Sequence, residues 1–96
     1  MKGKLKDVFT IISNLPWDSD LYVENGDLAL DSNVVVAAEN NTSDHVDGFR
    51  YYLTIQEVQD VVENLEQQTG DLSFEMILKA VEHYFVNDSY INIRDY

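Results

Sequence analysis

Apolar residues recur every three or four positions in three stretches of the chain, which predicts three amphipathic helices. The first helix covers residues 4–14 and stops before Pro16. The second begins with a capping box, in which Thr54 and Glu57 satisfy each other's backbone donors, and stops at Gly70. The third is capped by Asp71 or Ser73. Its apolar face consists of Phe74, Ile77, Leu78, Val81 and Phe85.

Shorter apolar runs predict the strands. Residues 21–24 and 27–30 flank Asn25-Gly26, a pair typical of tight hairpins because both central residues of a type I′ turn need positive φ. Further strands are predicted at 34–38, 49–53 and 90–94, with a polar loop at 39–48. Residues 1–96 are therefore predicted to be a single α+β domain, with a mostly antiparallel sheet of four to five strands and about three amphipathic helices.

The charge of the chain restricts its partners. It carries 18 acidic and 6 basic residues, a net charge of −12. Three of the basic residues, Lys2, Lys4 and Lys6, lie at the start. The rest of the chain has 3 basic and 18 acidic residues and therefore a net charge of −15. This charge repels nucleic acid and anionic membranes and favours a basic protein partner. Solubility alone is an equally good explanation of the charge.

No motif in the chain indicates catalysis. Cysteine is absent, the four glycines are scattered, and no phosphate-binding pattern occurs. Asp18-Ser19-Asp20 begins like a calcium loop, but Ala29 stands at the position of the bidentate Glu. A metal site at Asp44-His45-Val46-Asp47 lacks convergent ligands elsewhere. We therefore expect no enzyme activity, no catalytic residue, no metal and no cofactor. The lack of a long apolar run predicts a cytoplasmic protein. We also expect it to be a monomer or small oligomer.

Acidic residues lie beside aromatic residues near the segments 17–24 and 39–48. Rigid aromatic side chains anchor interfaces and carboxylates pair with Arg and Lys, so this mixture suits a protein-binding surface. The alternative for each aromatic residue is burial in the core of a small domain. The predicted partner-binding residues are Trp17, Asp18, Asp20, Tyr22, Glu24, Glu39, Asp44, Asp47 and Tyr51.

A small, acidic, cysteine-free chain of this kind resembles the immunity proteins of bacterial polymorphic toxin systems, including contact-dependent growth inhibition. The stretch YLTIQEVQDVV at 52–62 and the segment 84–88 also resemble a small bacterial domain family associated with such loci. The resemblance implies a tight complex with a basic nuclease toxin domain, with a ribonuclease expected first, whose active site the protein occludes. The alternative is an acidic adaptor or a DNA-mimic regulator that binds another basic protein.

Overall fold

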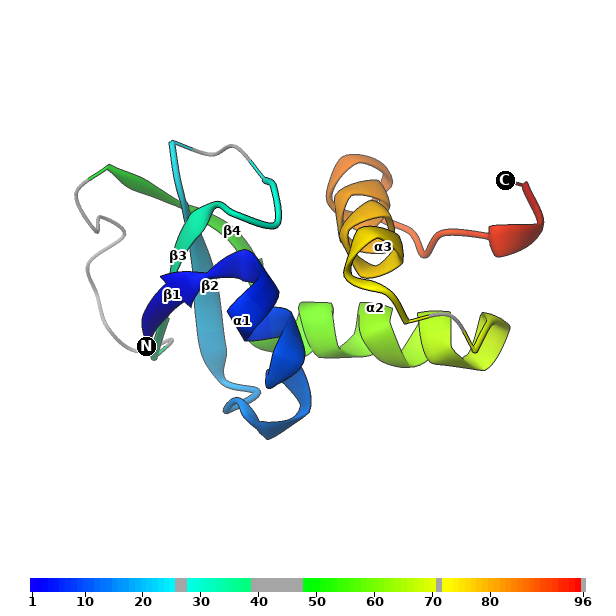
Figure 1. Cartoon of the computed structure of the whole chain (residues 1–96), viewed down its shortest axis with the longest axis horizontal. Coiled ribbons are helices and arrows are strands. Elements are labelled where there is room, and N and C mark those ends of the chain that lie inside the picture. Colours follow the sequence, from blue (N-terminus) through cyan, green and yellow to red (C-terminus); the bar gives the residue numbers. More distant parts are fainter. Residues whose placement is uncertain (26–27, 39–47, 71, 96) are drawn as a thin grey trace.

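The computed structural model describes residues 1–25, 28–38, 48–70 and 72–95 (Figure 1). Four strands form one sheet in the order β1-β3-β2-β4, and all strand pairs are antiparallel. The strands are β1 (Lys2–Lys4), β2 (Ser19–Glu24), β3 (Asn33–Ala38) and β4 (Phe49–Thr54). The helices are α1 (Leu5–Thr10), α2 (Ile55–Gln68) and α3 (Phe74–Asn87), with short 3₁₀ turns η1 (Ile12–Asn14) and η2 (Ile93–Asp95). The predicted α+β class, with a four-stranded sheet and three helices, is confirmed.

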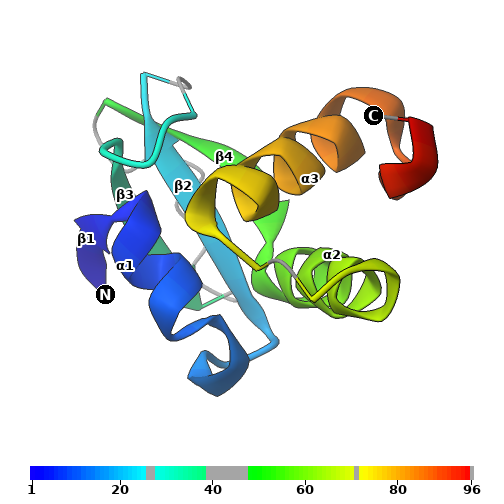
Figure 2. The ribbon, with the colours of Figure 1, turned by 45° about the vertical axis from the view of Figure 1, so that its right-hand side comes forward.

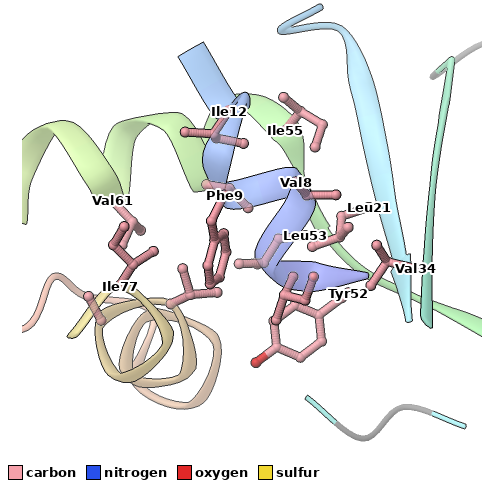
Figure 3. Packing of buried hydrophobic residues seen from close by; sticks show 14 of the residues in the cluster. Val8, Phe9, Ile12, Leu21, Val34, Tyr52, Leu53, Ile55, Val61 and Ile77 are labelled. Carbon is pink, nitrogen blue, oxygen red and sulfur yellow. The ribbon is translucent and has the colours of Figure 1, made fainter. Parts of the chain in front are cut away.

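One hydrophobic core joins the helices to one face of the sheet (Figures 1 and 2). Side chains alternate along a strand, so Leu21 and Val23 of β2 face the helices while their neighbours face away. In Figure 3, Phe9 of α1 points toward Val61 of α2 and Ile77 of α3. Each of the three helices thus contributes to a core that the sheet closes on one side.

The predicted helix at 4–14 is only partly correct. Lys2–Lys4 instead forms the edge strand β1, in which Lys2 pairs with Val35 and Lys4 with Asn33. The regular helix begins at Leu5, where the Leu5 and Lys6 N–H groups donate to the carbonyl oxygens of Ser32 (3.0 Å) and Leu30 (3.1 Å). These bonds satisfy donors that the first turn of a helix cannot pair internally. The start of α1 is therefore fixed both by a distant segment, through Leu30 and Ser32, and locally, because the Lys4 N–H donates to Asp7 Oδ2 at 3.1 Å.

The predicted strand at 27–30 is wrong, and β2 pairs with β3 instead. Residues 28–30 are not extended as a strand, and Gly26 and Asp27 lie outside the described residues. Ser32 closes a turn here, because its N–H donates to the Ala29 carbonyl (3.0 Å) and its hydroxyl accepts from the Ala29 N–H (2.9 Å). The turn holds the carbonyl groups that cap α1, so the same backbone does not pair with β2.

The capping box of α2 is confirmed. The Glu57 N–H donates to Thr54 Oγ1 and the Thr54 N–H donates to Glu57 Oε1, both at 3.1 Å. The helix ends at Gln68, close to the predicted stop at Gly70. Ser73 caps α3, since its Oγ accepts from the Met76 N–H at 3.3 Å; Asp71 lies outside the described residues.

The predicted apolar face of α3 is partly wrong. Ile77 and Val81 are buried, but Phe74 and Phe85 are 38% and 49% exposed. Both residues lie near an end of α3, Phe74 at its first position and Phe85 two residues before its last, and Phe85 rests on the Tyr52 ring of β4 but stays half exposed. The C-terminal end of α3 is marked by Asp88, which adopts a left-handed conformation with φ 53°.

The predicted closing strand at 90–94 is also wrong, because this segment ends in η2 and pairs with no strand. The side chain of Gln68 takes the place of a strand neighbour. Its Nε2 donates to the Ile91 carbonyl at 2.7 Å, and its Oε1 accepts from the Ile93 N–H at 3.0 Å. Ile91 is buried in the core. Apolar contacts of Tyr90, Ile91 and Ile93 and the Gln68 amide therefore hold the segment without a strand neighbour.

Candidate protein-binding surface

The sheet brings four of the predicted partner-binding residues to one face. Asp20, Tyr22 and Glu24 alternate with the core residues of β2 and so point away from the helices. Tyr51 of β4 stands opposite Tyr22, and Val35 of β3 stands on its other side. We call the side formed by these five residues the outer sheet face.

A β-bulge aligns the aromatic residues of this face. The register between β2 and β4 shifts after Leu21, so Leu21 pairs with Leu53 while Tyr22 pairs with Tyr51. The extra residue, Tyr52, therefore turns into the core together with Leu53. Bulges often re-aim side chains in this way.

Tyr22 and Tyr51 play different parts on the outer sheet face. Their rings meet edge to face, with centroids 6.1 Å apart and an interplanar angle of 75°. Tyr22 is only 4% exposed, whereas Tyr51 is 49% exposed. Tyr22 therefore supports Tyr51 from below and offers little surface of its own, which corrects the prediction that both aromatic rings face a partner.

Glu24 is engaged within the fold. The Asn33 amide donates to its two carboxylate oxygens over 3.4 and 3.5 Å, and the Lys4 ammonium group donates to the Asn33 Oδ1 at 2.7 Å. These contacts link β2, β3 and β1 across the sheet. Both Glu24 and Asp20 are half-buried. Of the acids on or next to β2, Asp18 is therefore the most accessible.

Trp17 and Asp18 lie in the turn that leads into β2, where the Ser19 N–H donates to the Pro16 carbonyl at 3.2 Å. Both side chains are exposed. Glu39, Asp44 and Asp47 lie outside the described residues. Asp20, Tyr22, Glu24 and Tyr51 thus lie together on the outer sheet face, and Trp17 and Asp18 lie just before β2.

A second group of aromatic and apolar residues, three of them exposed and Tyr84 partly buried, was not predicted from the sequence. It consists of Tyr84, Phe85 and Val86 at the end of α3 and Tyr90 just after it, and we call it the helical surface. Phe85 is 49%, Val86 77% and Tyr90 45% exposed. A usable signal was present: Tyr84, Phe85 and Val86 are three successive large residues that spread over about 200° of the helix, so they cannot all face the core.

Ring contacts hold the helical surface in place. Phe85 stacks on Tyr52, with centroids 4.0 Å apart and planes at 10°. The rings of Tyr84 and Tyr90 lie 5.5 Å apart at 31°. Burial, reinforced by nearby Glu82, raises the pKa of Tyr52 to about 12. Desolvation also raises the pKa of Tyr84, with further contributions from Glu57, which is hydrogen-bonded to it, and from Asp88.

The acids of α2 border this surface. The helix carries Glu57, Asp60, Glu63 and Glu66 and no basic residue. Asp60 and Glu63 line an open hollow together with Tyr90, and Asp60, Glu63 and Glu66 form no ion pair with any described residue. Like charges spaced three apart on a helix are slightly destabilising. These acids therefore project an uncompensated negative field toward solvent.

Neither a metal-binding cluster nor a membrane-spanning helix is found in the part of the chain that the structure describes. Within the described residues, no three His, Asp or Glu side chains approach closely enough to hold a metal ion. The described helices are also too short or too polar to cross a membrane. What the structure presents is exposed aromatic rings bordered by carboxylates, the composition of a surface for cationic side chains.

Comparisons with known proteins add a family. Neither a curated protein nor a solved structure matches the chain. One family model, described as "Domain of unknown function (DUF7716)", matches residues 2–93. The match runs from β1 through α3 and reaches η2, so it includes both the outer sheet face and the helical surface. The chain therefore belongs to the DUF7716 family.

Proposed function

We propose that this protein is a non-catalytic immunity protein, which binds a basic nuclease toxin domain, a ribonuclease in the first instance, and blocks its active site by occlusion. The observation that carries the proposal is the excess of acid on exposed elements, above all on α2, whose four acids have no basic residue among them. A nuclease binds phosphates through a basic cleft, and carboxylates on a rigid scaffold can take the place of those phosphates.

The structure supports binding through two further features. Exposed aromatic rings, including Trp17 and Tyr51, lie beside acids, as expected of interface anchors. Tyr51 is held in strand β4 of the sheet, so it loses little conformational freedom on binding. No catalytic group is required of this protein. The resemblance to immunity proteins, together with the cytoplasmic location that it implies, makes a basic nuclease domain, sought first among the products of neighbouring genes, the first partner to test.

The test measures association and inhibition together. The purified protein is mixed with this basic nuclease domain in a stopped-flow instrument, and the nuclease activity of the mixture is assayed. We expect stoichiometric inhibition and an association rate that falls about tenfold or more between low and physiological salt, because screening shortens the range of steering to about 8 Å. Unimpaired nuclease activity at a saturating ratio would refute the immunity function.

The variants Asp18→Ala and Asp20→Ala address the outer sheet face. An acid that is desolvated at the interface costs about 2–5 kcal/mol when truncated, mainly through faster dissociation, and a rim acid costs far less. Asp31→Ala is the matched control, because Asp31 is exposed and pairs with Lys6 within the chain at 3.5 Å. Binding to a basic protein that is not a nuclease would favour the adaptor or DNA-mimic function instead.

A further inference from the structure

We infer that the helical surface (Tyr84, Phe85, Val86 and Tyr90) is a docking site for arginine side chains of a basic protein partner. The inference rests on the proposed function for the identity of the partner, and it adds a contact surface that the sequence did not predict. It is argued from exposure, from the fixed positions of the rings and from the surrounding charge.

Three residues of the helical surface are exposed to solvent. Val86 is 77% exposed and Phe85 and Tyr90 are about half exposed, although each is a large apolar or aromatic residue. Phe85 and Val86 lie at the end of α3 and Tyr90 lies in the segment after it, and the neighbouring Tyr84 is close to Glu57 at the start of α2. Apolar residues clustered on a small polar protein mark interaction sites more often than scattered ones do.

The rings are also fixed before a partner arrives. Phe85 lies flat on Tyr52, which is anchored in the core by the bulge of β4. Glu57 holds Tyr84 by a hydrogen bond and is itself held by the capping box with Thr54. Side chains that are already ordered lose little entropy on binding, so their contact area contributes efficiently to affinity.

The surrounding charge selects the occupant. Glu57 and Asp88 lie near Tyr84, Glu82 lies near Tyr52, and Asp60 and Glu63 line the hollow beside Tyr90. Val86 lines a separate hollow with Lys79, Glu82 and His83, so acids predominate beside the rings but not around Val86. A second copy of this chain, also at −12, would be repelled. Arginine fits best among cationic side chains, because its planar guanidinium group stacks on a ring while its N–H groups bind a carboxylate, and it is less strongly hydrated than lysine.

The helical surface continues toward the outer sheet face around the strand β4. In the described sheet, β4 is an edge strand. Tyr51 and Tyr52 are successive residues of β4. Tyr51 belongs to the outer sheet face, whereas the Tyr52 ring stacks on Phe85 on the helix-covered face. A single partner that reaches over the β4 edge therefore meets exposed aromatic rings on both sides.

The experiment uses two peptides of equal charge as probes, an arginine hexapeptide and a lysine hexapeptide, titrated into the isotope-labelled full chain and followed by NMR. We expect the arginine peptide to shift the amides of residues 84–86 and 90 most, and to bind more tightly than the lysine peptide. Phe85→Ala should weaken arginine-peptide binding about 2- to 30-fold, the range expected for loss of a cation–π contact. Phe74→Ala is the matched control, since Phe74 is an exposed phenylalanine (38%) at the opposite end of α3.

A second variant, Val86→Lys, tests the site without disturbing the fold, because the Val86 side chain is largely exposed. Its new positive charge should repel the arginine peptide. Weaker binding in both Phe85→Ala and Val86→Lys, with Phe74→Ala unchanged, supports the site. Equal shifts over all acidic segments, or no preference for arginine over lysine, would overturn it. The same variants are then tested against the toxin domain. If the protein binds the toxin domain tightly and neither variant weakens that binding, this site is overturned and the proposed function stands. If the arginine site is preserved but the protein inhibits no nuclease, only the proposed function is refuted.

Discussion

Replacing Gln68 by Ala should release the C-terminal segment from α2 while leaving the rest of the fold in place. The Gln68 amide makes two bonds to the backbone of this segment, to the Ile91 carbonyl (2.7 Å) and from the Ile93 N–H (3.0 Å). Each such bond contributes about 0.5–1.5 kcal/mol net, so we expect a loss of about 1–3 kcal/mol in local stability. The slightly better helix propensity of alanine recovers only a few tenths of a kcal/mol.

Hydrogen exchange measures this loss directly. The Ile93 amide donates to Gln68, so its protection should fall about 5- to 150-fold in Gln68→Ala, the equivalent of the local free energy. Gln56→Ala is the control, because it changes the same residue type on the same helix at the end away from Gln68 and the C-terminal segment. If Ile93 exchanges equally fast in both variants, the amide does not hold the segment. Because Tyr90 lies in this segment, Gln68→Ala should also weaken arginine-peptide binding.

Three further predictions concern stability. Thr54→Ala should cost about 1 kcal/mol in urea unfolding, because the Glu57 N–H loses its cap; an unchanged midpoint would show that water replaces the cap fully. Leu65→Ala should cost about 2–5 kcal/mol, since Leu65 is fully buried, whereas exposed Val86→Ala should stay within about 0.5 kcal/mol; equal losses would contradict the assigned core. Burial raises the pKa of Tyr52 from 10.0 to about 12, so the folded state favours the neutral phenol; its contribution is fully present below pH 10 and is lost as the pH rises to about 12. Stability should therefore decline more steeply over this range in the wild type than in Tyr52→Phe, and parallel declines would argue against the shift.

For the candidate site, strand alternation decided which sequence predictions converged. Asp20, Tyr22 and Glu24 were chosen for their composition, and the period of two along β2 then placed all three on one face with Tyr51. The sequence did not indicate that Tyr22 is covered or that Glu24 bonds Asn33, because both depend on neighbouring strands. The helical surface was missed because Phe85 fits the apolar spacing of α3, and spacing alone does not reveal where the core beneath a helix ends.

The sequence by itself determined the elements whose signals are local. The capping box at Thr54, the Ser73 cap, the apolar periods of α2 and α3 and the β-branched run of β3 each act within a few residues, and each produced the predicted element. Net charge and the absence of cysteine are likewise properties of the chain alone. Tertiary structure decided the rest: that Lys2–Lys4 pairs as an edge strand, that β2 pairs with β3, and that residues 90–94 bind Gln68 without forming a strand. In each case the deciding hydrogen bonds join backbone groups to partners distant in sequence, and a short stretch of sequence specifies that such a group needs a partner without specifying which one it finds.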